Sequence, residues 1–147
     1  MDIDKLREEL KRDEGCVHSV YLDHLNLKTV GIGHLLTEWD EEYDKPVGTE
    51  VSEDRVNELF AKDIDVTIDE CKVLYEHFDD LPEEAQRIIA NMMFNLGRPR
   101  LSKFKKMREA VMDANWIEAA IQMEDSLWAK QVPNRAERLC ERMRNVS

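Results

Sequence analysis

The fold of this chain is decided by residues 13–34, which read DEGCVHSVYLDHLNLKTVGIGH. β-Branched, aromatic and other apolar side chains are interrupted by Asp23, His24 and Asn26, which suit a turn. We therefore predict a small, twisted, antiparallel sheet over residues 17–36. Gly31 and Gly33 within it indicate a bend or a close approach of another segment to the backbone.

Helical patterns precede and follow this sheet. Residues 3–12 carry apolar side chains at helical spacing, with Asp2 or Asp4 as the N-cap. The acidic stretch 37–51 contains proline and glycine, which predicts an irregular connector. Further helices are expected over 52–76, 83–96, and about 100–113, 115–126 and 134–144, the first capped by Ser52 and the second bounded by Pro82 and Gly97.

Together these elements predict an α+β protein that is mainly α. At 147 residues the chain is expected to form a single domain. A small N-terminal α+β lobe at about 1–60 and an all-α lobe at about 75–147 would be joined by the helix at 52–76. The methionines at 92, 93, 107, 112, 123 and 143 are expected to fill the core. A cleft between the lobes is the default place for a substrate.

Charge and hydropathy exclude several classes of protein. The net charge is −11, although residues 98–147 carry 11 basic and 7 acidic side chains. Nucleic acid is not an expected partner, because phosphate contacts need a dominant basic face. No window approaches the roughly 20 apolar residues that span a bilayer, and the charged N-terminus lacks the apolar core of a secretory signal. We therefore expect a soluble protein of the cytoplasm, without stable membrane insertion, unless another protein exports it.

No metal or other cofactor is expected. The three cysteines, an odd number, are expected to be reduced thiols. Cys16, His18 and His24 lack the fourth ligand and the close spacing of a structural zinc site. A calcium loop beginning at Asp63 fails because its sixth position is Ile68 rather than glycine. A zinc amidase is disfavoured because four scattered histidines supply no clear set of ligands.

Two carboxylates and a hydroxyl, those of Glu14, Asp23 and Thr29, surround the predicted sheet. Glycoside hydrolysis requires two carboxyl groups on opposite sides of one bond. One protonates the leaving oxygen, and the other activates water or stabilises positive charge. No other segment of the chain offers so complete a set of roles, so this one is the candidate catalytic site.

The same residues belong to motifs that occur along nearly the full chain. They are Asp13-Glu14-Gly15, Tyr21-x-Asp23, Thr29 to Thr37, Leu59-Phe60 with Asp63, Asn91-Met92-x-Phe94-Asn95-x-Gly97, and Trp128-x-x-Gln131-x-Pro133-Asn134-Arg135-Ala136. In content and order these motifs resemble the phage-type lysozymes, the endolysin muramidases. The resemblance implies a lysozyme-like two-lobe fold with a small N-terminal β-hairpin sheet, a long connecting helix and an all-α C-terminal lobe. It also implies hydrolysis of the β-1,4 bond between N-acetylmuramic acid and N-acetylglucosamine in bacterial peptidoglycan, with inversion at the anomeric carbon.

Carried over residue by residue, the resemblance assigns roles in this reaction. It implies that Glu14 is the general acid and that Asp23 is the second carboxylate. Thr29 would supply the hydroxyl that helps to position the attacking water. Arg135 resembles an arginine of the family's cleft that pairs with the acid. His34 is expected to form a structural salt bridge with Asp63.

Further residues are expected to contact the substrate. Asn95 stands where the family often has a glutamine that lines the cleft, and Gln131 and Leu35 are candidates with it, besides Arg135. Trp116 and Trp128 are expected to belong to the core rather than to a sugar platform. In the hairpin, Leu25 and Leu27 stand where the family is usually more polar or aromatic, which predicts different sugar contacts on that side.

The family also implies a biological setting. We expect a monomer that is made in the host cytoplasm and reaches the periplasm and cell wall once the membrane is permeabilised, with a separate holin-type membrane partner. Its role would be phage-driven host lysis. The alternative is a catalytically weak muramidase-like module for wall binding or scaffolding, a use that the acidic surface would suit.

Overall fold

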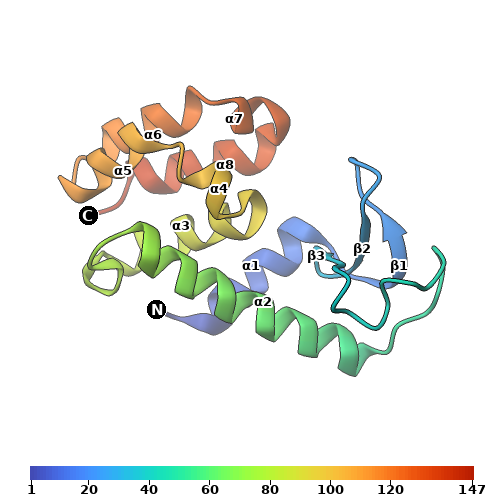
Figure 1. The fold of residues 1–147 in the computed structure, drawn as a ribbon. Helices are drawn as coiled ribbons and strands as arrows, with labels where there is room; N and C mark the ends of the chain where they lie inside the picture. The colour runs from blue at the N-terminus through green and yellow to red at the C-terminus, as the bar shows by residue number, and fades with distance from the viewer. The chain divides into compact units, whose positions relative to one another are not determined.

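The structure, a computed structural model, describes residues 1–147 (Figure 1). Its elements in chain order are α1 (Ile3–Glu14), β1 (Val17–Leu22), β2 (Lys28–Gly31), β3 (His34–Leu35), α2 (Glu53–Leu74), the 3-10 turn η1 (Phe78–Asp80), α3 (Glu83–Leu96), α4 (Arg98–Leu101), α5 (Lys105–Met112), α6 (Trp116–Glu124), α7 (Leu127–Gln131) and α8 (Pro133–Arg144). The predicted class, α+β and mainly α, is confirmed. None of the helices combines the length and the apolar character needed to cross a bilayer.

The chain divides into two compact units, one of residues 7–66 and one of residues 1–6 with 67–147. Both α1 and α2 cross the boundary between the units. The capping residues predicted for these helices are in place. The Oδ1 atom of Asp2 accepts a hydrogen bond from the backbone N–H of Lys5 (3.1 Å), and the Oγ atom of Ser52 accepts one from the N–H of Arg55 (3.1 Å).

The unit of residues 7–66 contains the predicted antiparallel sheet, in the order β1-β2-β3. Tyr21 on β1 lies opposite Thr29 on β2, and Thr29 lies opposite Leu35 on β3. The predicted close approach at Gly31 is also present. A β-carbon there would lie 3.0 Å from Cγ1 of Val56 on α2, so even a methyl group would be crowded against this helix.

The connector at 37–51 is irregular, as predicted, but it is firmly attached to the sheet. Its last residues run beside β1, with an isolated bridge between Ser19 and Glu50. The N–H of Val20 donates to the carbonyl of Thr49 (2.9 Å). These bonds satisfy backbone groups at the outer edge of β1, where they would otherwise be exposed.

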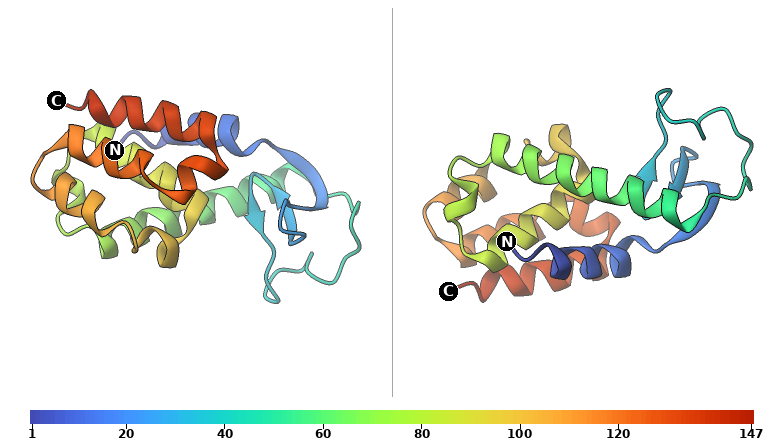
Figure 2. Two further views of the ribbon diagram at one scale, coloured as in Figure 1. Left: turned by 90° about the horizontal axis from the view of Figure 1, so that it is seen from above. Right: turned by 90° about the horizontal axis from the view of Figure 1, so that it is seen from below.

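The other unit is helical. In it α3 packs against α4 and α8, and α6 packs against α5 and α8 (Figures 1 and 2). Most of the side chains of α3 are buried. Five of the six methionines expected in the core are buried, at 92, 93, 107, 123 and 143. The prediction is wrong for Met112, which is exposed at the last position of α5.

Two helix predictions need correction. The helix expected over 100–113 is interrupted, with α4 ending at Leu101 and α5 beginning at Lys105. Leu101 and Met107 are both fully buried although a continuous helix would place positions six apart on different faces, so the break brings both into the core. The short helix α7 was not predicted. It begins after Ser126, whose Oγ atom accepts a hydrogen bond from the N–H of Ala129 (3.2 Å).

Candidate active site

Glu14 is the last residue of α1, and its half-buried carboxylate lies against the backbone of Gly33. A β-carbon at Gly33 would stand 2.7 Å from Oε1 of Glu14, closer than unbonded atoms approach. Gly33 also has a φ of 63°, in the left-handed region that glycine tolerates best. Gly33 therefore allows the backbone to turn and leaves room for the carboxylate of Glu14.

Asp23 lies just after β1 and is held by the hairpin turn. Its Oδ1 atom accepts hydrogen bonds from the N–H groups of Leu25 (2.8 Å) and Leu27 (2.9 Å). The backbone N–H of Asp23 in turn donates to the carbonyl of Leu27 (3.0 Å). The other carboxylate oxygen, Oδ2, has no hydrogen bond within the protein. The turn thus fixes one oxygen of Asp23 and leaves the other for water or substrate.

Thr29 is buried on β2, and its hydroxyl donates to the carbonyl of Leu27 (2.9 Å). The same peptide segment therefore binds both Asp23 and Thr29, through the N–H and the carbonyl of Leu27 respectively. Because the hydroxyl hydrogen of Thr29 is engaged, its oxygen can act toward a water molecule as an acceptor.

Tyr21 stands near both acidic residues. Burial raises the pKa of its phenol above the usual 10.0, and the negative charges of Glu14 and Asp23 raise it further. The charge of Cys16 contributes in the same direction.

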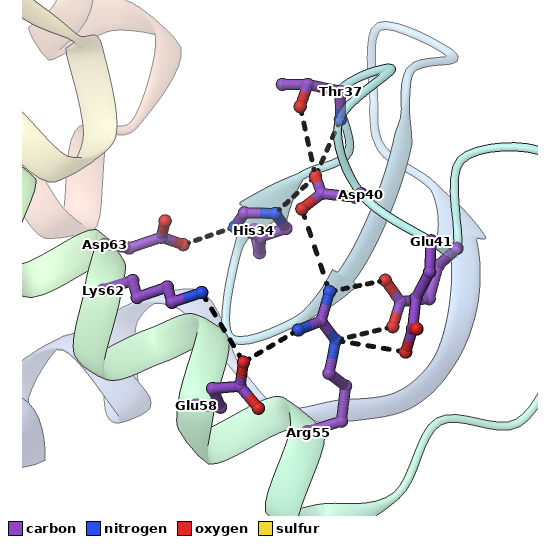
Figure 3. A network of polar contacts seen from close by, with 9 residues as sticks. His34, Thr37, Asp40, Glu41, Arg55, Glu58, Lys62 and Asp63 are labelled. Carbon is purple, nitrogen blue, oxygen red and sulfur yellow. Dashed lines mark hydrogen bonds and ion pairs between the residues drawn. The ribbon is translucent and has the colours of Figure 1, made fainter.

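His34, next to Gly33 in the chain, lies between two further carboxylates (Figure 3). Its Nδ1 atom is 2.7 Å from Oδ2 of Asp63, the expected partner, and its Nε2 atom is 2.9 Å from Oδ2 of Asp40. Both ring nitrogens can donate only in the imidazolium form. Burial lowers the pKa of His34, but the hydrogen bonds to Asp63 and Asp40 outweigh it, and the net pKa lies above 6.5.

Arg55 on α2 holds the connector beside His34 (Figure 3). It binds Glu42 with two nitrogens, Nε to Oε2 at 2.7 Å and Nη2 to Oε1 at 3.0 Å. It also donates to Glu58 (3.1 Å). The hydrogen bond from Arg55 keeps the pKa of Glu42 below its usual value, and the same pair raises the pKa of Arg55. His34 and Arg55 together form what we call the connector clamp.

Three of the residues expected to contact substrate, Asn95, Gln131 and Arg135, belong to the helical unit. Asn95 accepts a hydrogen bond from Nε1 of Trp128 through Oδ1 (2.7 Å), and its amide nitrogen has no hydrogen bond within the protein. Gln131 is exposed and accepts from Nη2 of Arg100 (2.9 Å). Arg135 is buried and donates through Nε to Oδ1 of Asn91 (2.8 Å). The pairing of Arg135 with Glu14 stays a prediction.

Other expected residues are placed as follows. Leu35 lies on β3 opposite Thr29 and is exposed. Trp128 is buried in the core, as predicted, and its ring meets that of Phe104 edge to face with centroids 6.5 Å apart. Trp116 is half-buried. The structure contains no cluster of three or more histidine, cysteine or acidic side chains arranged to hold a metal ion.

Comparison with known proteins identifies the family. The model of the family described as phage lysozyme matches residues 11–145. The chain belongs to the phage lysozyme family. It is therefore a glycoside hydrolase, and the family supports a role as a peptidoglycan hydrolase.

The relatives of this lysozyme are found in different settings. A probable T4-type lysozyme 2 of Dictyostelium discoideum is 30% identical over 156 residues, covering 93% of this chain and 92% of the relative. The pre-baseplate central spike protein Gp5 of Enterobacteria phage T4 is 26% identical over 91% of this chain and 26% of its own length. The peptidoglycan hydrolase gp36 of Pseudomonas phage phiKMV is 28% identical over 97% of this chain and 15% of its own length.

Proposed function

We propose that this lysozyme is an inverting muramidase that cleaves the β-1,4 bond between N-acetylmuramic acid and N-acetylglucosamine. The observation that carries the proposal is the pair of carboxylates in one compact unit: Glu14 lies against Gly33 at the end of α1, and Asp23 is held by the hairpin turn through one oxygen only. Glycoside hydrolysis needs two such carboxyl groups near one bond. Membership of the phage lysozyme family supports the same substrate.

The environment of each group supports the role that the family resemblance gives it. Glu14 protonates the leaving glycosidic oxygen from its place against Gly33. Asp23 uses its open Oδ2 atom to accept a proton from water, while Oδ1 stays bound to the turn. Thr29 accepts a hydrogen bond from the same water, because its own hydrogen is donated to Leu27. Water then attacks from the face opposite the departing sugar, which inverts the anomeric carbon.

The remaining residues would hold the glycan strand. The free amide nitrogen of Asn95 can donate to the carbonyl of an N-acetyl group. Leu35 offers an exposed apolar surface beside Thr29. Gln131 and Arg135 are the further polar candidates, and the structural pair of His34 with Asp63 supports the sheet.

The proposal is tested by the clearing of stripped bacterial cell walls in a turbidity assay. The parent protein should clear the walls, and Glu14→Gln, which removes the acid and keeps the shape, should lower the rate by a factor of about 100 or more. Clearing that survives Glu14→Gln would reject Glu14 as the acid. A parent protein that binds the walls without clearing them would favour the alternative, a wall-binding or scaffolding module.

We also propose, from the family alone, that the enzyme serves host lysis and depends on a holin-type partner to reach the wall. Expression in a bacterial host should then cause lysis only when the inner membrane is permeabilised, for example by chloroform. Lysis without permeabilisation would contradict the need for such a partner.

A further inference from the structure

The wall on which Glu14 rests belongs to a short turn between β2 and β3. A β-carbon at Gly33 in this turn would stand 2.7 Å from Oε1 of Glu14. Gly31 and Gly33 have φ values of 66° and 63°, which glycine adopts at little cost, so their backbone restricts the turn weakly. Ile32 between them is buried and anchors the middle of the turn. The end of the turn at Gly33 needs a further anchor to stay against Glu14.

His34 supplies this anchor, because it follows Gly33 directly and its ring is held at both nitrogens (Figure 3). Its Nδ1 atom is 2.7 Å from Oδ2 of Asp63 on α2, and its Nε2 atom is 2.9 Å from Oδ2 of Asp40 in the connector. A ring that is held at one nitrogen can pivot about that bond, whereas a ring held at both nitrogens cannot. Asp40 therefore decides whether His34 is a fixed anchor or a pivoting one.

Asp40 is itself held in place. Its Oδ2 atom accepts a hydrogen bond from the backbone N–H of Thr37 (2.9 Å), and its own N–H donates to the carbonyl of Thr37 (2.9 Å). Its Oδ1 atom lies 3.9 Å from Nη2 of Arg55, which binds the buried Glu42. The side chain of Asp40 is only 15% exposed. The connector thus presents a preorganised carboxylate to the ring of His34.

We propose that Asp40 is a positioning residue of the active site, which acts through His34 to hold Gly33 against the carboxylate of Glu14. Asp40 takes part in no chemical step. Loss of its bond to His34 frees the end of the turn, and Glu14 then spends less time in the orientation that delivers its proton. A misplacement of about 1 Å can slow an enzyme roughly 100-fold. This inference rests on the proposed function, because it takes Glu14 as the general acid.

The protonation of His34 controls this series of contacts. Only the imidazolium form donates from both nitrogens, so a neutral ring can donate to Asp40 or to Asp63 but not to both. Burial lowers the pKa of His34, but the hydrogen bonds to Asp63 and Asp40 raise it above 6.5. The full set of contacts is therefore present below this pKa and is lost as the pH rises through it. The other charged groups of this cluster are Arg55, Glu58 and Lys62 on α2 and Glu41 and Glu42 in the connector.

The test measures kcat and KM on soluble, uncrosslinked peptidoglycan strands, at a temperature where every variant is folded. Asp40→Ala should lower kcat about tenfold at pH 6. Its KM should change by less than about twofold, because Glu14 acts in the transition state rather than in binding. Asp40→Asn keeps an oxygen that can accept from His34, so it should recover part of the lost kcat.

Glu42→Ala is the matched control. It removes a carboxylate from the same connector, but Glu42 binds Arg55 and not the ring of His34. Glu42→Ala should lower stability and leave kcat unchanged. Backbone amide signals of residues 31–33 should broaden in Asp40→Ala and stay sharp in Glu42→Ala.

The pH dependence separates positioning from a merely structural role. The pKa of His34 can be followed through the chemical shifts of its ring protons. As the pH rises through this pKa, the ratio of kcat between the parent and Asp40→Ala should fall toward one. The ratio between the parent and Glu42→Ala should stay constant.

Three results would each overturn the proposal. They are an unchanged kcat in Asp40→Ala, an equal loss of kcat in Glu42→Ala, and a ratio for Asp40→Ala that does not vary with pH. Failure of the proposed function would instead appear as a parent protein that does not cleave, or as wall clearing that survives Glu14→Gln. Even then, amide signals of residues 31–33 that stay sharp in Asp40→Ala would reject the link from Asp40 to Gly33.

Discussion

The carboxylate of Glu14 occupies the space that a side chain at position 33 would fill, with Oε1 only 2.7 Å from where a β-carbon of Gly33 would stand. This contact joins the end of α1 to the segment between β2 and β3. The proposed acid is thus positioned by a glycine that lies 19 residues further along the chain. Because a side chain at position 33 would displace the carboxylate of Glu14, we expect it to lower the activity.

Gly33→Ala should therefore damage both stability and activity. The left-handed backbone should cost about 1–2 kcal/mol in the free energy of unfolding, and the displaced Glu14 should lower the rate of wall clearing at least tenfold. Gly48→Ala is the control, because Gly48 also has a positive φ, 94°, but nothing lies within 4 Å of its added β-carbon. It should lose stability and keep the clearing rate at a temperature where both variants are folded. Equal clearing rates for the two variants would refute the positional role of Gly33.

Asp23→Asn separates the chemistry of Asp23 from its place in the turn. The amide oxygen can still accept the hydrogen bonds from Leu25 and Leu27, so the free energy of unfolding should change by less than about 1 kcal/mol. The lost charge should lower the clearing rate by a factor of about 100 or more. Asp23→Ala should lose activity and also destabilise the hairpin. An active Asp23→Asn variant would remove Asp23 from the mechanism.

The contribution of His34 to stability should depend on pH. Its folded-state pKa lies above 6.5, so the stabilisation is fully present below about pH 6.5 and is lost as the pH rises through the raised value. Asp40 limits the window on the acid side, because its pKa is lowered from 3.8 by hydrogen bonds from Thr37 and His34, which outweigh its burial. Its stabilisation is present above pH 3.8 and is lost as the pH falls through the lowered value.

His34→Gln should accordingly cost about 1–3 kcal/mol near pH 6, as expected for hydrogen bonds to charged groups. The difference between this variant and the parent should shrink steadily as the pH is raised. Urea unfolding of both proteins from pH 5 to 9 measures it. A difference in the free energy of unfolding that stays constant across this range would show that the charge on His34 does not contribute to stability.

Arg55→Lys should weaken the connector clamp although it keeps the charge. A lysine cannot make the two parallel hydrogen bonds that Arg55 makes to Glu42, and Glu42 is only 5% exposed. We expect a loss of about 1–3 kcal/mol in the free energy of unfolding. A double-mutant cycle with Glu42→Gln measures the coupling directly. A coupling free energy near zero would mean that the pair of Arg55 and Glu42 does not stabilise the fold.

Much of this fold could be predicted from the sequence because helix caps and apolar periodicity depend on residues close together in the chain. Ser52 caps α2 through a bond to the N–H of a residue three positions later, and apolar periodicity gives the buried face of α3. The break in the helix between Leu101 and Met107 could not be predicted from local patterns. Both side chains are pulled into the core by tertiary packing, which breaks a helix that the local pattern continues.

The proposed catalytic residues were found from their motifs, but the contacts that position them were not. Glu14 and Gly33 meet through the tertiary fold, and no spacing rule connects them. Asp40 and Arg55 were missed because an acidic connector and a helix surface normally suggest solvated charges. The hydrogen bonds of the folded protein, from His34 to Asp40 and from Arg55 to the buried Glu42, show that these charges are paired. Tyr21 was part of a motif, yet its nearness to both Glu14 and Asp23 became visible only in the structure.

The central claim, that Glu14 and Asp23 direct an inverting cleavage of the glycan strand, is tested most directly by the products formed from purified peptidoglycan. Early in the reaction, before mutarotation, proton NMR should show the new reducing end on N-acetylmuramic acid in the α configuration. A product that appears first as the β-anomer would mean retention and a different role for Asp23. A new reducing end on N-acetylglucosamine would mean that another bond is cleaved.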